Sequence, residues 1–273
     1  MKLAYCVQLP DSIVNVAAYR GKGMDETLQD IADIGYEGVE LFLRDPDLLD
    51  RSQLTKILEK TGLKVCCVGT APIAAQDRLT LSDPDKEKRA AAIGRVRKLI
   101  DFASAYGCTP VGIGKFRGNL PSNDRSSGWK WLRDGFLEIC EYAEGKNVTI
   151  ALEPQERGNL NNLISTHDGV VWVEQLGMSN YGLLLDTYHM SLEDESLTAG
   201  IVEAAGKIAH VHVSDSNRTA PGQGMLDFVA VVRALRAVGY DGFLSVEIAQ
   251  PADALAAARK AWVHLNYIRN MYT

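Results

Sequence analysis

Residues 181–190 read YGLLLDTYHM, an uninterrupted apolar run that stops at Asp186. Three other runs stop in the same way. VTIALEP (148–154) reaches Glu153, AHVHVSDS (209–216) carries His212, and GFLSVEI (242–248) reaches Glu247. Runs that are apolar at successive rather than alternate positions are typical of parallel strands buried on both faces. A hydrophobic strand has no need of a charged or imidazole side chain at its end, so these four residues require their own explanation.

The same pattern continues in both directions and predicts eight strands. Longer segments with helical periodicity separate them, and several end at a glycine that can adopt a left-handed C-cap. The predicted strands are Lys2–Leu9, Gly38–Leu43, Lys64–Gly69, Pro110–Gly114, Val148–Glu153, Gly182–Asp186, Ala209–Ser214 and Phe243–Ile248. The predicted helices are Asp25–Ile34, Arg51–Thr61, Asp85–Tyr106, Ser126–Gly145, Thr166–Leu176, Leu197–Ala205, Leu226–Val238 and Ala252–Asn270.

This regular alternation predicts an α/β fold, a single (β/α)8 TIM barrel that occupies residues 1–273 as one domain. No linker, low-complexity tract or block of like charge divides the chain. Asp83-Pro84 is the predicted N-cap and first turn of the longest helix. A doubly wound open sheet is the alternative fold, but no GxGxxG motif follows the first strand.

The composition excludes several classes of partner. The net charge is −6 and no basic cluster occurs, which argues against a nucleic-acid partner. No run approaches the roughly 20 apolar residues of a membrane span, and the start MKLAYCVQLPDS does not resemble a signal peptide. The cysteine count of five is odd and no CxxC occurs, which fits a reducing compartment. We therefore expect a cytoplasmic protein that binds neither membrane nor nucleic acid.

The four polar strand ends predict a metal site. The carboxyl ends of all strands meet on one face of a barrel, so side chains far apart in sequence converge there. Any one of them alone could be a cap, an ion-pair partner or a hydrogen-bonded core residue. Together, three carboxylates and an imidazole would repel and desolvate one another without a cation. The predicted ligands of one divalent metal ion are Glu153, Asp186, His212 and Glu247. Their oxygen-rich set without sulfur suits Mn²⁺, Mg²⁺ or Co²⁺, with Zn²⁺ as a further option.

The motifs around these residues resemble the xylose-isomerase-like sugar phosphate isomerase/epimerase family, and within it the ketose 3-epimerases and 5-keto-L-gluconate epimerase. The matching segments are LEPQER, LLLDTYHM, HVHVSDSNRTAPGQG and LSVEI. The intervals between successive predicted ligands, 33, 26 and 35 residues, are also similar to those of that family. The likeness covers nearly the whole chain.

The resemblance implies a ketose or keto-sugar acid as the small-molecule substrate. In that family a metal holds the C2 carbonyl and C3 hydroxyl oxygens, and a metal-stabilised enediolate forms when C3 loses its proton. Glu153 and Glu247 match the two catalytic residues, which remove and return the proton on opposite faces of C3 and so invert it. Asp186 and His212 match ligands with a purely structural role.

Several residues near the strand ends are predicted to bind the substrate. Two of them, His189 and Arg218, match substrate contacts of the family. Glu40, near the end of the second strand, either faces the substrate or supports a ligand. His210 lies two residues before His212 and is expected to be a hydrogen-bonded core histidine. The complete set of predicted substrate-binding residues is His189, Arg218, Glu40, Lys115 and Arg117.

Two further features bear on the choice of substrate. Lys115 and Arg117 follow the fourth strand and Arg44 follows the second; three cations at the barrel mouth would favour a carboxylate or phosphate on the substrate. Solvated surface charges are the alternative interpretation. The epimerases also carry a glutamate six residues after the first ligand, where this chain has Asn159, and Glu156 is a candidate replacement.

Other functions fit the same residues less well. A dehydratase of the inosose type would use the same site to expel a hydroxyl group. A DNA-repair nuclease resembling endonuclease IV would need several zinc ions, and this acidic chain has only five histidines. A silent sugar-binding protein would not need paired acid/base residues. Relatives of this type form homodimers or homotetramers, so either assembly is expected here.

Overall fold

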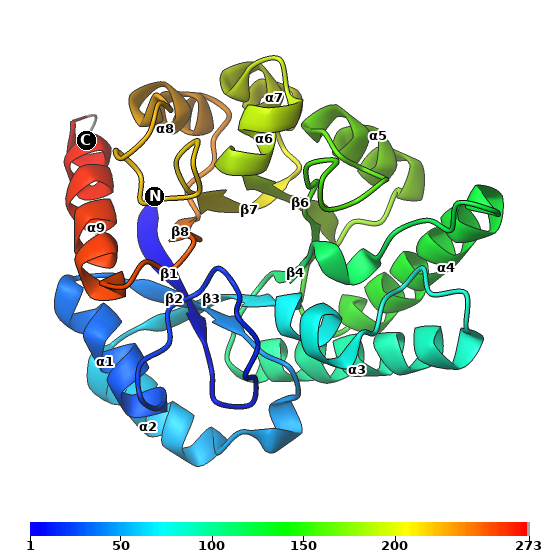
Figure 1. The fold of residues 1–273 in the computed structure, drawn as a ribbon, viewed down its shortest axis with the longest axis horizontal. Coiled ribbons are helices and arrows are strands. Elements are labelled where there is room, and N and C mark those ends of the chain that lie inside the picture. Colours follow the sequence, from blue (N-terminus) through cyan, green and yellow to red (C-terminus); the bar gives the residue numbers. More distant parts are fainter. Residues whose placement is uncertain (272–273) are drawn as a thin grey trace.

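A computed structural model describes residues 1–271, and its centre is a closed barrel of eight parallel strands (Figure 1). The strands follow one another in chain order, and the last pairs with the first. The predicted TIM barrel is confirmed, and the open sheet is excluded. Residues 272 and 273 of the predicted domain lie outside the described residues. The strands are β1 (Lys2–Gln8), β2 (Gly38–Phe42), β3 (Lys64–Gly69), β4 (Val111–Ile113), β5 (Ile150–Leu152), β6 (Tyr181–Asp186), β7 (Ile208–Val213) and β8 (Phe243–Val246).

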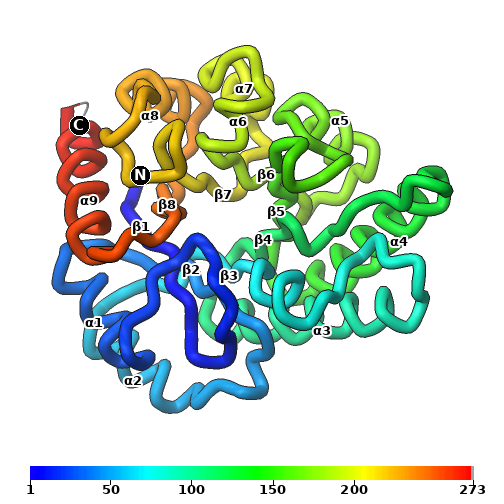
Figure 2. Tube along the Cα trace, in the orientation of Figure 1, coloured from blue at the N-terminus to red at the C-terminus, as the bar shows by residue number. Residues whose placement is uncertain are grey.

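Helices surround this barrel, as the ribbon and the tube both show (Figures 1 and 2). Short turns of other types follow β2, β3 and β4: η1 (Pro46–Leu48), η2 (Ile73–Asp77) and η3 (Lys115–Arg117). The α-helices of residues 1–271 are α1 (Met24–Ile34), α2 (Arg51–Thr61), α3 (Lys86–Ala105), α4 (Arg125–Glu144), α5 (Thr166–Leu176), α6 (Thr187–Glu193), α7 (Leu197–Glu203), α8 (Phe228–Ala237) and α9 (Ala254–Asn270).

Local capping explains where these helices begin. In α5, Ser165 accepts a hydrogen bond from the Asp168 backbone while the Asp168 side chain accepts from Ser165, which forms a capping box. The predicted N-cap of α3 at Asp83 is wrong. Asp85 caps that helix by accepting from the Glu87 N–H, and Asp83 instead accepts from the Asp85 N–H in the turn before the helix.

The register of the strands brings the polar ends together. In the β6–β7 pair, Asp186 lies opposite His212. Irregular register near Leu183 in β6 and near Val39 in β2 marks local bulges, which re-aim side chains in a sheet. The carboxyl end of the barrel therefore presents polar side chains from strands that are mostly apolar.

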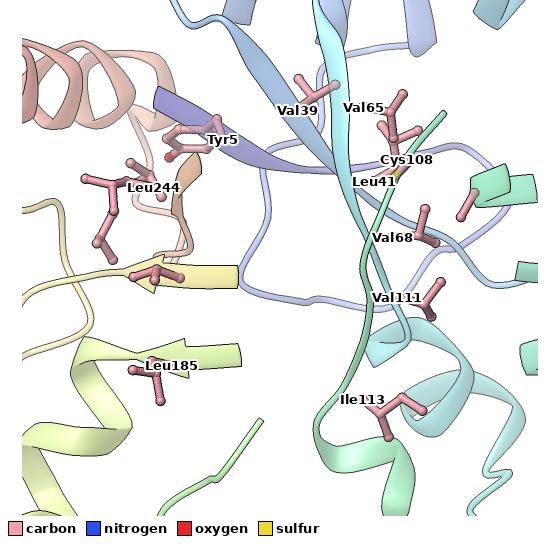
Figure 3. Packing of buried hydrophobic residues seen from close by; sticks show 14 of the residues in the cluster. Tyr5, Val39, Leu41, Val65, Val68, Cys108, Val111, Ile113, Leu185 and Leu244 are labelled. Carbon is pink, nitrogen blue, oxygen red and sulfur yellow. The ribbon is translucent and has the colours of Figure 1, made fainter. Parts of the chain in front are cut away.

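The main core lies between the strands and the helices, where side chains such as Leu41, Val68 and Val111 are fully buried (Figure 3). Burying one side chain of this size stabilises the fold by about 1.5–3 kcal/mol. The inside of the barrel is different, because it also holds the buried polar side chains of Glu40 and His210.

The connection from β1 to α1 folds back onto its own strand. The Gln8 N–H donates to the Tyr19 carbonyl at 2.8 Å, and the Tyr19 N–H donates to the Cys6 carbonyl at 2.9 Å. The Gln8 side chain donates to the carbonyls of Ser12 and Val14 at 3.2 and 2.7 Å. These bonds fix residues 9–19 as a wall beside the barrel mouth.

Two features of the structure relate to the compartment expected for this chain: its helices and its cysteines. Within residues 1–271 no helix combines the length and apolarity that crossing a membrane requires. All five cysteines are buried and free of disulfides. Burial raises the pKa of Cys140 to about 12, so its thiol is a packing group at neutral pH.

Candidate active site

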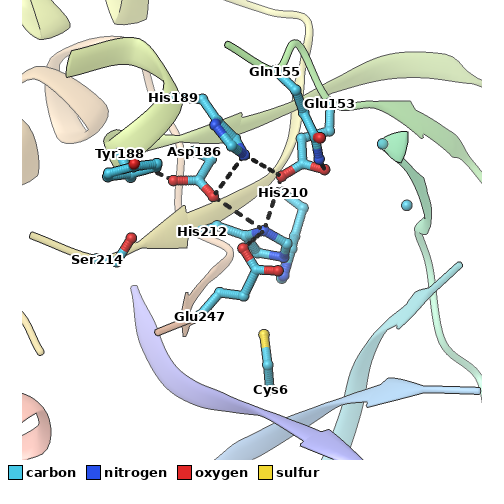
Figure 4. Close-up of polar contacts among 12 residues, drawn as sticks. Cys6, Glu153, Gln155, Asp186, Tyr188, His189, His210, His212, Ser214 and Glu247 are labelled. Carbon is cyan, nitrogen blue, oxygen red and sulfur yellow. Dashed lines mark hydrogen bonds and ion pairs between the residues drawn. The ribbon is translucent and has the colours of Figure 1, made fainter. Parts of the chain in front are cut away.

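Four side chains from the ends of β5, β6, β7 and β8 point at a common position (Figure 4). One candidate ligand atom of each lies within 4.8 Å of the others. His212 Nδ1 is central: it lies 3.4 Å from Glu153 Oε1, 3.3 Å from Glu247 Oε2 and 3.8 Å from an Asp186 oxygen. The structure thus brings the four predicted ligands together, although 94 residues separate Glu153 from Glu247.

The donor atoms of this cluster suit a divalent cation. Ligand atoms lie about 2.0–2.2 Å from a small divalent ion, so two ligands of one ion lie roughly 3–4 Å apart. The distances around His212 Nδ1 fall in that range. Glu153 Oε1 and His212 Nδ1 are buried and have no hydrogen-bond partner among residues 1–271, which is costly for polar atoms unless an ion engages them.

The other nitrogen of His212 is held from across the barrel. His212 Nε2 lies 2.8 Å from Glu40 Oε2, so this nitrogen is assigned the proton and donates it, which leaves the Nδ1 lone pair facing the cluster. Glu40 therefore orients the candidate ligand His212 and also borders the cavity, so both of its predicted roles, support of a ligand and contact with the substrate, stay predictions. Burial opposes ionisation of Glu40, but the electrostatic effect of His212 and hydrogen bonds from both histidines lower its pKa well below the usual range.

His210 lies one layer deeper and donates to the same Glu40 oxygen at 3.0 Å. Burial is the largest cause of its lowered pKa, so His210 is neutral at neutral pH. It is a hydrogen-bonded core histidine, as expected from its place two residues before His212.

Arg218 reaches the cluster from the loop after β7. Its guanidinium donates to Asp186 and Glu247 and lies 5.0 Å from the Tyr188 ring centroid. Its backbone is left-handed, with φ of 60°, and the Asp215 carbonyl accepts its N–H. The pKa of Asp186 is lowered because Arg218, His189 and His212 together outweigh the effect of burial. Burial raises the pKa of Glu247 despite the same arginine.

His189 lies in the first turn of α6, close to two of the predicted ligands. Its Nε2 is 3.9 Å from oxygens of Glu153 and of Asp186, and its Nδ1 is 2.7 Å from Glu156 Oε2. Burial would lower the pKa of His189, but Asp186 and Glu156 raise it. The side chain of Asn159 donates to the same Glu156 oxygen, so Glu156 orients the histidine instead of contacting Glu153.

Two residues near Glu153 were missed by the sequence analysis. One is Gln155, whose side chain donates to Glu153 Oε2. Gly114, at the end of β4, is the second, because a Cβ there would collide with both Glu153 and Gln155. A glycine directly after an apolar strand was the available signal for this close approach.

The prediction that Arg117 binds substrate is wrong. Its side chain is 0% exposed, and its guanidinium donates to backbone carbonyls of Glu153, Asn162 and Leu163 at 2.6–3.0 Å. Arg117 therefore braces the loop after β5. Arg44 also lies outside the mouth cavity, paired with Asp77 at 3.2 Å.

The cluster opens into a cavity of about 460 Å³ at the barrel mouth. Lys115, Asn15 and Tyr188 are among its lining residues, so Lys115 is the one member of the predicted cationic group that borders it. A larger cavity of about 1080 Å³ lies outside the barrel beside Trp129 and Trp172. None of the metal-type clusters formed by residues 1–271 borders this larger cavity beside Trp129, so the mouth cavity is the candidate active site.

A closed parallel barrel with three carboxylates and an imidazole on its last four strands defines a TIM-barrel protein with a candidate metal site. More particularly, the chain belongs to the xylose isomerase-like TIM barrel family, which matches residues 28–265. This confirms the resemblance drawn from the motifs.

Several relatives bear the names of sugar epimerases. The chain is 30% identical to L-ribulose 3-epimerase of Mesorhizobium japonicum, over 82% of this chain and 75% of that protein. It is 25% identical to 3-dehydro-D-guloside 4-epimerase of Escherichia coli, over 81% of this chain and 86% of that protein. A solved structure of an L-ribulose 3-epimerase superposes with a TM-score of 0.81 at 26% identity, covering 99% of this chain and 96% of the other. These likenesses support an epimerase rather than a dehydratase.

Proposed function

We propose that this chain is a metal-dependent epimerase that inverts C3 of a ketose or a related keto sugar. The observation that supports it most is the approach of two carboxylates to one point from different sides of the barrel. Glu153 comes from β5 and Glu247 from β8, and each lies within 3.4 Å of His212 Nδ1. A sugar bound at that point would have one carboxylate near each face.

The four candidate ligands would hold the metal, and two of them, Glu153 and Glu247, would also transfer protons. A divalent cation held by Glu153, Asp186, His212 and Glu247 would polarise the substrate carbonyl and acidify the neighbouring C–H. Mn²⁺, Mg²⁺ or Co²⁺ matches this ligand set best, with Zn²⁺ as the further option.

The proton is transferred by the two glutamates. One removes the C3 proton, and the other delivers a proton to the opposite face, which inverts the centre. His189 Nε2 and the Arg218 guanidinium lie beside Glu153 and Glu247, where they would bind substrate oxygens and help orient C3. Lys115 at the cavity edge would contact the far end of the substrate.

Proton exchange provides the test. The metal-loaded protein is incubated in deuterated water with a panel of ketoses, with keto-sugar acids and, because one relative is named for a guloside, with 3-keto-glycosides. The proposal predicts deuterium at C3 of a ketose, or at the carbon adjacent to the carbonyl of a keto glycoside, and a product of unchanged composition. Glu153→Gln and Glu247→Gln should each block exchange on one face. A dehydrated product would support the lyase instead, and full exchange after rigorous chelation would refute the metal-dependent mechanism.

A further inference from the structure

A second cavity adjoins the candidate active site. It has a volume of about 840 Å³ and shares Asn15, Val16 and Gln250 with the inner cavity that contains the metal-type cluster. The cavity therefore continues the barrel mouth in one direction.

Two segments from opposite ends of the chain form this outer cavity. One is the wall of residues 9–19 with the adjoining Arg20, and the other is the connection from β8 to α9 with the first residues of α9. Figure 2 shows the first segment in dark blue, below β1, and the second in orange-red, between β8 and α9. The wall is held to β1 through Tyr19, so the outer cavity does not depend on an unsupported loop.

The chemistry of the outer cavity suits neutral hydroxyl groups. The side chains of Asn15 and Arg20 are exposed, and Gln250 Nε2 donates to the Ile248 carbonyl at 2.9 Å. Arg20 Nη1 donates to the Ser12 carbonyl at 3.3 Å, and Asp253 supplies the opposite charge. Amide, guanidinium and carboxylate groups bind hydroxyls in several orientations. The balanced charge gives no preference for an anion.

Size separates the roles of the two cavities. Cavities of about 300–1,000 Å³ bury drug-sized ligands, which are larger than a monosaccharide. The inner cavity of about 460 Å³ therefore accommodates a single sugar, and the outer cavity remains for a further group of similar size.

Building on the proposed function, we infer that the mouth is a two-part site for a glycosylated keto sugar. The reacting sugar lies in the inner cavity, and a second sugar joined to it lies in the outer cavity among Asn15, Arg20 and Gln250. The second sugar takes no part in the chemistry and contributes binding energy that positions the first.

The test compares free and glycosylated substrates. The metal-loaded protein is given a free ketohexose, its glucosyl derivatives linked through O1, O4 or O6, and a 3-keto disaccharide, and exchange in deuterated water yields kcat/KM. We expect at least one glycosylated compound to exceed the free ketose tenfold. Ala252→Trp fills the outer cavity, which Ala252 lines, and should remove this advantage while changing kcat/KM of the free ketose less than twofold.

A matched variant controls for the bulky substitution. Ala205→Trp changes an exposed alanine before β7, at the opposite end of the barrel, and should leave all substrates unaffected. The inference is overturned if no glycosylated compound exceeds the free ketose, or if Ala252→Trp affects both classes equally.

Binding is measured separately from turnover. Saturation-transfer NMR should show contacts to the protons of the second sugar in the wild type and their loss in Ala252→Trp. If no compound undergoes exchange, the epimerase proposal fails, while this binding measurement still supports or refutes the two-part site.

Discussion

Replacing Glu40 by Gln should weaken metal binding about tenfold without unfolding the protein. The carboxylate accepts hydrogen bonds from His212 and His210 at 2.8 and 3.0 Å, and the amide keeps its size and one acceptor oxygen. A hydrogen bond to a charged group contributes about 1.5–3 kcal/mol, against about 0.5–1.5 kcal/mol for a neutral one. The loss of roughly 1.4 kcal/mol corresponds to a tenfold change in Kd. This agrees with the 10–100-fold losses typical when the partner of a ligating histidine is changed.

The assay is calorimetric titration of metal-stripped protein with Mn²⁺ at one pH, together with thermal unfolding of each variant. Glu138→Gln is the control, because Glu138 is exposed and pairs with Arg97 on the outer helices, away from the metal-type cluster. Its Kd should match the wild type. A change of less than twofold in the folded Glu40→Gln protein would refute the role of Glu40 in orienting His212.

Four further predictions follow from the geometry. Gly114→Ala should lower kcat/KM about 100-fold, because the added methyl group displaces Glu153 and a shift of about 1 Å in a reacting group can lower the rate by that factor. Gly145→Ala is the control: the space around its Cα is open, so this variant should retain full activity in the same assay. Arg117→Met should lower the free energy of unfolding by about 3–5 kcal/mol in urea titrations, because it leaves several buried carbonyls without donors. A variant with normal stability and only a raised KM would contradict the role of Arg117 in holding the loop after β5. Lys115→Met should raise KM about tenfold for a keto-sugar acid and less than threefold for a neutral ketose, and equal effects on both would exclude a charge-specific contact. Stripping the metal should lower Tm by about 5–10 °C relative to protein with Mn²⁺ at 100 times its Kd, as measured by thermal unfolding.

The sequence predicted those features that depend on local pattern. The barrel follows from apolar runs and helical periodicity, and the convergence of Asp186 and His212 follows from their place at adjacent strand ends. Strand bounds differ by at most a few residues, because pairing rather than composition decides where β4 and β5 stop.

Features that depend on packing between loops were not predicted. Arg117 was assigned to the mouth because it follows a strand, but the carbonyls that surround it come from residues 45 and 46 positions later in the chain. The pairing of Glu156 with His189 likewise depends on α6, a helix that was not predicted. Asp186 both ends β6 and caps α6 by accepting a hydrogen bond from the Tyr188 N–H, so the helix begins directly after the strand. A side chain's charge is visible in a sequence, whereas its burial depends on partners that only the fold supplies.

The return of residues 9–19 to β1 has a consequence for protein engineering. Both ends of this segment are attached to the same strand, through Gln8 and Tyr19, and none of the candidate metal ligands belongs to it. Residues 9–19 can therefore be exchanged as one unit between relatives, which should alter the sugars that enter the cavity while the reacting groups keep their positions.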